Sequence, residues 1–139
     1  MDQITTRRRE VHQFYLETLA PLEERELITI PRVPGNCVTN YHMFYVLLRD
    51  ASTRDALMAY LRQKSISAVF HYVPLHTSAM GKTFGYREGD LPLTEELSAR
   101  LLRLPFYPDL TRDEQILVVS SISEFLDRGH AVSSGRQQQ

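Results

Sequence analysis

The chain has 139 residues, of which 42% are hydrophobic and 24% charged, with a formal net charge of −1. This length and composition are typical of one globular domain. The near-neutral balance gives no general attraction to nucleic acid or to an anionic membrane, and no apolar run approaches the roughly 20 residues of a membrane span.

Cysteine content and the N-terminal sequence bear on the compartment. The single cysteine, Cys37, excludes an internal disulfide framework and a metal site built from several cysteines. The first residues, MDQITTRRREVHQ, include arginines but no apolar segment of the kind that a signal peptide needs. We therefore expect a cytoplasmic protein.

The first half of the chain predicts helices alternating with strands. Apolar residues at helical spacing predict a helix over 4–22, ending near Ala20 because Pro21 cannot continue it. A short strand and a Pro/Gly/Asn loop follow over 27–41. The apolar run 42–48 predicts a strand that is covered on both faces.

The next segments predict a helix and a second strand. Ser52 is expected to cap a helix that buries Leu57, Met58 and Leu61, with Asp55 completing a capping box. A strand is expected over 65–72.

The second half of the chain begins with a long loop, 73–93, and loops of that length are usually functional or disordered. Thr94 is expected to cap a helix that carries Leu97, Leu101 and Leu102 and stops before Pro105. Thr111 and Glu114 form a capping box for the last helix, which Gly129 is expected to close. The pattern indicates an α+β domain with a few strands and helices packed on one side.

The segment FHYVPLH, residues 70–76, is the strongest candidate for a site. Two histidines without a third ligand nearby are not a metal signature, although Glu88 and Asp90 lie in the same loop. Imidazole and phenol groups can bind phosphate or sugar oxygens. A pair of structural histidines beside a packed tyrosine explains the residue types equally well.

Catalytic motifs give little. The stretch AMGKT, 79–83, lacks the first glycine of a phosphate-binding loop, because His76 stands at that position. The basic run 6–10 is more typical of a solvated helix face than of a nucleic-acid site. The only lysines, Lys64 and Lys82, lie in polar settings that would not lower their pKa for imine chemistry.

Three segments in order resemble the C-terminal part of the DegT-type sugar aminotransferases: NYHMFYVLLRD; RDALMAYLRQKSISAVFHYVPLHTSAMGKTFG; and LTEELSARLLRLPFYPDLTRDEQILVVSSISEFL. The resemblance runs from about residue 3 to 127. It implies a small domain of the aspartate-aminotransferase fold, with a short, mostly antiparallel sheet. Residues 1–22 would be the end of an interdomain helix, 23–128 the small domain and 129–139 a disordered tail.

The resemblance also implies a division of labour. Pyridoxal phosphate would serve the full-length enzyme, expected to be a homodimer, but its lysine would lie in an N-terminal large domain that this chain lacks. No catalytic residue, bound cofactor or metal is then expected in this chain alone. An independent α+β binding module without catalysis is the alternative.

By this resemblance, His71, Tyr72 and His76 would contact the nucleotide-sugar substrate. Tyr86 and Arg87 are weaker candidates, in a flap formed by residues 77–92. Many relatives have an arginine just before this motif or one extra residue within it. Here Ala68 and Val69 stand at the aligned positions.

Overall fold

The computed structural model describes residues 2–134, and the side chains of residues 3–129. Its elements follow the order α1 (Asp2–Glu24), β1 (Tyr45–Leu47), α2 (Ala51–Gln63), β2 (Val69–Phe70), a 3₁₀ turn η1 (Leu75–Thr77), α3 (Ala79–Thr83), α4 (Pro92–Arg100), β3 (Leu101–Arg103) and α5 (Arg112–Ser134). No helix among these is long and apolar enough to cross a membrane.

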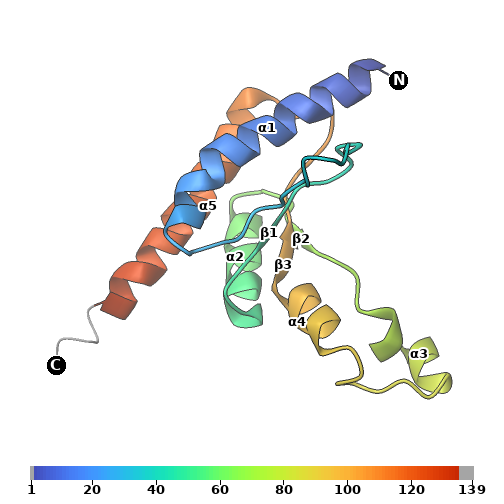
Figure 1. Ribbon diagram of the computed structural model, residues 1–139. Helices are drawn as coiled ribbons and strands as arrows, with labels where there is room; N and C mark the ends of the chain where they lie inside the picture. The colour runs from blue at the N-terminus through green and yellow to red at the C-terminus, as the bar shows by residue number, and fades with distance from the viewer. Residues whose placement is uncertain (1, 135–139) are drawn as a thin grey trace.

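The sheet has three strands in the order β1-β3-β2, and both pairings are antiparallel. The strand–helix–strand unit β1-α2-β2 therefore does not place its two strands side by side, because β3 lies between them (Figure 1). Thr29 pairs with Leu47 at the free edge of β1 through two backbone hydrogen bonds of 2.9 Å. The expected α+β class with an antiparallel sheet is confirmed.

The central strand β3 is where the prediction from sequence was wrong. Leu101 and Leu102 were expected to extend a helix, but α4 ends at Arg100 and both leucines belong to the sheet. Leu101, Leu102 and Arg103 pair with Leu47, Val46 and Tyr45 of β1. Pairing on both sides outweighs the helical spacing of the leucines.

The register gives the sheet two different faces. Val46 of β1 and Leu102 of β3 lie opposite each other and are fully buried. They face the helical side, where α1, α2 and α5 supply buried residues such as Tyr15, Leu61 and Ile122. Tyr45, Arg103 and Val69 form the neighbouring row and point to the other face.

Helices α1 and α5 pack against each other in the same direction (Figure 1). The Arg112 guanidinium lies 4.1 Å from the centre of the Phe14 ring at one end, and Arg25 pairs with Asp127 at 2.7 Å at the other. The Tyr15 hydroxyl donates to the Pro105 carbonyl at 3.0 Å, which ties α1 to the chain leaving β3.

Several helix ends differ from the predictions. Pro21 lies inside α1, which continues to Glu24; Glu26, at φ +57°, then reverses the chain. The Leu27 and Glu26 N–H groups donate to the Leu22 and Glu23 carbonyls, a Schellman motif formed without glycine.

Of the other predicted helix caps, two are wrong and one is confirmed. Asp50, not Ser52, caps α2 by accepting from the Thr53 N–H at 2.7 Å. Leu91, without a side-chain cap bond, precedes α4 in place of Thr94. The Thr111–Glu114 capping box is confirmed by hydrogen bonds of 2.8 and 3.3 Å.

Other corrections concern single segments. Helix α5 passes through Gly129 to Ser134, so the expected tail begins no earlier than residue 135, outside the described residues. Ile116 and Leu117 of this helix are about half exposed, at 50% and 49%, although both are apolar. Strand β1 is shorter than the apolar run 42–48, and its residues Tyr45 and Leu47 are only half-buried.

Residues 73–93, which we call the arm, project from the body of the domain (Figure 1). The expected unstructured loop contains η1 and α3, and Gly81 of α3 rests directly on η1. A Cβ atom on Gly81 would lie 2.2 Å from the Leu75 carbonyl oxygen and 2.6 Å from that of His76. Glycine is therefore required where these two turns touch.

We predict that Gly81→Ala separates α3 from η1, because neither backbone oxygen can move away without breaking the turn. Amide hydrogen exchange should accelerate over residues 75–85 and stay unchanged in the sheet. Gly35→Ala is the matched control, since a Cβ there meets nothing within 4 Å. Equal exchange in the two variants would contradict the predicted packing.

Candidate functional site

The segment FHYVPLH is divided between two faces of the sheet. Side chains alternate along an extended strand, so Val69 and His71 point one way and Phe70 and Tyr72 the other. Val69 lines a hollow of about 280 Å³ together with Arg103, which we call the arginine hollow. Phe70 and Tyr72 line a second hollow of about 400 Å³, the tyrosine hollow.

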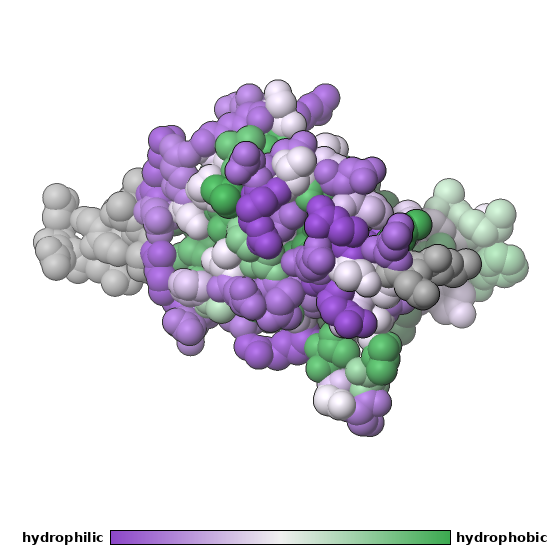
Figure 2. Space-filling view, turned by 90° about the horizontal axis from the view of Figure 1, so that it is seen from above, coloured by the Kyte–Doolittle hydropathy of each residue, from purple (hydrophilic) through white to green (hydrophobic). Residues whose placement is uncertain are grey.

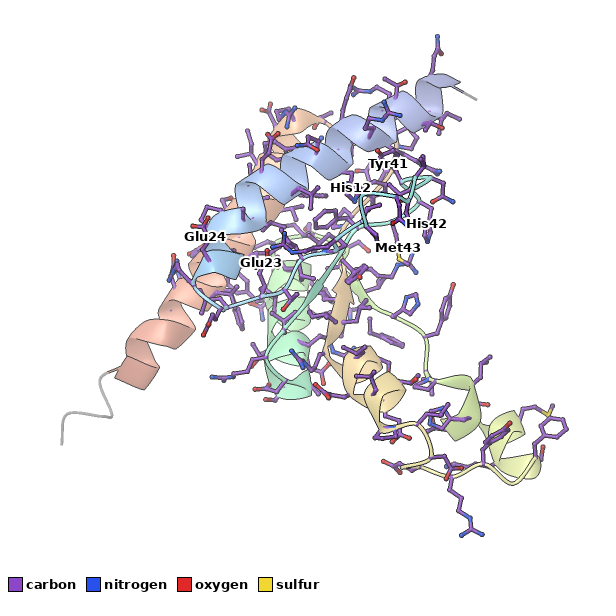
Figure 3. The ribbon with its side chains drawn as sticks, in the orientation of Figure 1. His12, Glu23, Glu24, Tyr41, His42 and Met43 are labelled. Atoms are coloured by element: carbon purple, nitrogen blue, oxygen red, sulfur yellow. The ribbon has the colours of Figure 1, made fainter. Side chains whose placement is uncertain are left out.

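The arginine hollow lies on the face of the sheet that carries Arg103. Its wall combines basic, aromatic and apolar side chains, among them His42, Met43, Arg103, Phe106 and Tyr107. The loop before β1 brings in His42 and Met43, and α1 supports this loop through His12, whose ring centre is 5.2 Å from that of Tyr41 (Figure 3). The chain after β3 supplies the aromatic residues.

Charged groups of the arginine hollow act on His71. Burial lowers the pKa of His71, and the positive charge of Arg103 and the His42 ring lower it further. Its Nδ1 atom is buried and has no hydrogen-bond partner among the described residues. These surroundings favour the neutral form of His71, and they leave one of its polar atoms without a partner.

The tyrosine hollow lies between α2, β2 and α4. Tyr72 is 73% exposed, and the Arg54 guanidinium lies 5.8 Å from the centre of the Phe70 ring. Val73 and Pro74 continue the wall toward the arm. A flat aromatic surface beside a guanidinium suits a planar or sugar-like ligand.

His76, expected from sequence to contact the substrate, is buried and bonded to a carboxylate of this chain. Its side chain is only 5% exposed, and its Nε2 atom donates to Glu95 Oε1 at 2.7 Å. The same oxygen accepts the Gly89 N–H at 2.8 Å. The hydrogen bond from His76 is the largest cause that lowers the pKa of Glu95, followed by the bond from Gly89. We call this arrangement the His76–Glu95 clasp.

Tyr86 and Arg87 lie farther along the arm, where both are exposed. The structure thus sets the five expected site residues in four surroundings: His71 beside one hollow, Tyr72 in the other, His76 in the clasp, and Tyr86 and Arg87 on the outer part of the arm. The sequence reasoning missed Arg103 and His42. The alternation of Leu102 and Leu104 around Arg103 was the signal for an extended strand.

The arm carries its apolar side chains outward. Leu75, Met80, Phe84 and Leu93 are 66–85% exposed, and no apolar side chain of residues 73–93 is fully buried. In Figure 2 the arm is the paler green group at the right edge, beyond a mostly hydrophilic body. Exposed apolar area of this extent is typical of a surface that another polypeptide or a ligand covers.

Metal ligation has no support in the described part of the chain, where no three His, Cys, Asp or Glu side chains gather in a metal-binding group. The lysines offer no nucleophile. Lys64 Nζ lies 2.5 Å from Glu124 Oε2, and this hydrogen bond raises the pKa of Lys64. Lys82 is exposed on the short helix α3.

The three-stranded antiparallel sheet with its packed helices matches solved structures of the aminotransferase fold. The chain belongs to the DegT/DnrJ/EryC1/StrS aminotransferase family, whose model matches residues 1–123. Enzymes of this family use pyridoxal phosphate.

Individual relatives agree with this assignment. The chain is 33% identical to the dTDP-3-amino-3,4,6-trideoxy-alpha-D-glucose transaminase of Micromonospora megalomicea subsp. nigra, over 91% of this chain and 33% of the relative. It is 32% identical to the pleiotropic regulatory protein of Geobacillus stearothermophilus, over 90% and 33%. The chain therefore spans about a third of the length of the curated relatives it matches.

Solved structures give the same picture. DesV of S. venezuelae, in complex with a ketimine intermediate, superposes with a TM-score of 0.80 at 30% identity, over 90% of this chain and 32% of that chain. The aminotransferase TlmJ of Streptoalloteichus hindustanus gives a TM-score of 0.79 at 26% identity, over 92% and 33%.

We predict that Glu95→Gln weakens the clasp and loosens the arm. The neutral amide cannot provide the charge-assisted bonds that the carboxylate gives to His76 and Gly89. Limited proteolysis within residues 77–91 should accelerate severalfold, with little change in global unfolding. Glu96→Gln is the control, because Glu96 pairs with Arg100 instead. Arm cleavage that accelerates equally in both variants would show that the clasp does not order the arm.

Proposed function

We propose that this chain forms the small domain of a nucleotide-sugar aminotransferase that moves an amino group from glutamate to a dTDP-4-keto-6-deoxyhexose. The observation that carries the proposal is the 33% identity with a dTDP-amino-sugar transaminase. The 30% identity with DesV, whose structure contains a ketimine intermediate, supports amino-group transfer as the class of reaction. In this role the chain supplies substrate contacts and not the groups that move protons.

The finer assignment rests on the segments MFYVLLRD, AVFHYVPLH and SARLLRLPFY. They resemble the dTDP-4-amino-4,6-dideoxygalactose transaminase of enterobacterial common antigen and lipopolysaccharide sugar synthesis. We propose this product, a cytoplasmic location and a homodimeric full-length enzyme. We further propose that a large domain carrying the cofactor lysine covers the exposed arm and the hollows.

The residues present do not fit pyridoxal phosphate as a lysine adduct. Lys64 is held protonated by Glu124, and a protonated amine is not a nucleophile. Lys82 is exposed to solvent on the short helix α3, and none of the apolar hollows described above contains it. No step of the reaction is therefore assigned to this chain through the cofactor.

Within the proposed enzyme, Tyr72 and His71 would act on opposite sides of β2. Tyr72 presents a hydroxyl and a ring face to the sugar or the base. His71, next to Val69 of the arginine hollow along the same side of the strand, has a buried Nδ1 atom without a partner. The clasp makes His76 a residue that positions the arm.

We predict that the isolated chain, treated with pyridoxal phosphate and borohydride, gives no stoichiometric label on a single lysine. Lys82 should label weakly and Lys64 less, because the Lys64 amine is paired with Glu124. Peptide mass spectrometry of the wild type, Lys64→Arg and Lys82→Arg measures this. Full labelling of one lysine that disappears when that lysine is substituted would overturn the proposal that the cofactor lysine lies outside this chain.

The substrate contact is tested in a chimera, in which residues 1–123 replace the matching third of the Micromonospora megalomicea transaminase. Tyr72→Phe should raise the KM for the dTDP-keto-sugar about three- to tenfold, as expected for one lost hydrogen bond. The glutamate half-reaction should keep its rate, because Tyr72 would contact only the sugar nucleotide.

Tyr60→Phe serves as the control, since Tyr60 packs on Phe125 of α5 away from both hollows. Equal losses in the two half-reactions would assign Tyr72 a structural role. A chimera that binds cofactor but aminates no dTDP-keto-sugar would overturn the proposed substrate class.

A further inference from the structure

Arg103 is a cation without a counter-charge. It lies half-buried on the open face of the sheet, and no carboxylate of residues 3–129 pairs with it. Among the other partly covered arginines of residues 3–129, Arg54 pairs with Asp55 at 2.9 Å and Arg100 pairs with Glu96, whereas Arg8 also has no ion pair. A guanidinium withdrawn from water is normally matched by an anion.

A second arginine, Arg112, also lines a hollow, but that hollow contains acidic residues. Arg112 lines a hollow of about 360 Å³ whose wall also contains Glu10 and Glu17. The wall of the arginine hollow contains no Asp or Glu residue of the described chain. Two acids outside the wall act on its Tyr107, Glu114 and Asp109. The Oε2 atom of Glu114 already accepts the Thr111 N–H and hydroxyl, each at 2.8 Å.

Two imidazoles add to this excess of donors. His42 lines the same hollow, and its Nδ1 lies 2.8 Å from Asn40 Oδ1. His71 is near enough to Arg103 and His42 for their charges to lower its pKa, and no carboxylate of the described chain opposes that effect. The Nδ1 atom of His71 is buried and lacks a partner. Such an atom is costly unless a ligand completes it.

We propose that Arg103, His42 and His71 bind the diphosphate group of a nucleotide sugar in the arginine hollow. This inference rests on the proposed function and names the part of the substrate that this face would hold. A guanidinium offers up to five N–H donors and binds phosphate in a forked geometry. The ring N–H groups of the imidazoles at its side can donate to further phosphate oxygens.

A single carboxylate fits the arrangement less well. One carboxylate would balance Arg103 and leave the two histidines unused, whereas a diphosphate has enough oxygen atoms for all three groups. The volume of about 280 Å³ is close to the lower end of ligand pockets, near 300 Å³, and suits a small anionic group. Phe106 and Tyr107 add apolar area to the wall beside the charged groups.

The test uses the full chain with isotope-labelled histidine and arginine side chains, followed by NMR. Inorganic pyrophosphate, dTDP and glutarate are titrated separately. Pyrophosphate and dTDP should shift the ring signals of His42 and His71 and the side-chain signal of Arg103, with saturation. Arg103→Gln should weaken pyrophosphate binding about tenfold or more, as expected for the loss of a charge-assisted contact. Arg112→Gln, the matched control, should bind as the wild type does.

Three results would overturn the proposal: no saturable shift, equal weakening in Arg103→Gln and Arg112→Gln, or tighter binding of glutarate than of pyrophosphate. If Arg103→Gln does not fold, His42→Gln on the loop before β1 replaces it, and the same loss of pyrophosphate binding is required. The titration needs no catalysis. If the chain binds pyrophosphate but the chimera aminates no sugar, the proposed function is wrong and the anion site stands. If the chimera aminates the sugar but the chain does not bind pyrophosphate, the proposed site is wrong and the proposed function stands.

Discussion

The pairing of β3 with two strands at once is the constraint on which the rest of this domain depends. The strand contains three residues, yet it joins β1 to β2 and buries Leu102 against the helices. The same three residues expose Arg103 on the opposite face. Because side chains alternate along a strand, burial of Leu102 determines the direction of Arg103. A slip of one residue would bury the guanidinium in the core and expose the leucine.

The local sequence around β3 explains why the helices were easier to predict than the sheet. Val11, Tyr15 and Leu19 recur at helical spacing and are buried in α1, and Leu57 and Leu61 do the same in α2. Both helices were predicted because amphipathic periodicity is a local property. Leu97, Leu101 and Leu102 also fit a helical face. Their true separation into α4 and β3 depends on hydrogen bonds to Val46 and Phe70, which are distant in sequence.

The site shows the same limit. Tyr72 and His71 were found as candidates because aromatic and imidazole groups after a strand are unusual, but their separation onto two faces follows from the pairing with β3. His76 has the residue type of a ligand and the surroundings of a structural residue, and only its distance to Glu95 distinguishes the two roles. Arg103 and His42 are 61 positions apart in the sequence, so no local motif could have joined them.

The arm reverses the usual distribution of side chains in a folded segment, because its internal contacts are polar and its apolar groups face outward. His76, Glu95 and Gly89 hold it through hydrogen bonds, while Leu75 and Phe84 remain exposed. Opening the arm of the chain alone would therefore uncover little new apolar surface, and the heat-capacity change of that step would be small. The free energy of opening the arm would therefore fall almost linearly as temperature rises. The free energy of unfolding the core would instead pass through a maximum at low temperature. If another polypeptide covered the arm, opening it would expose apolar surface, and its free energy of opening would again curve with temperature.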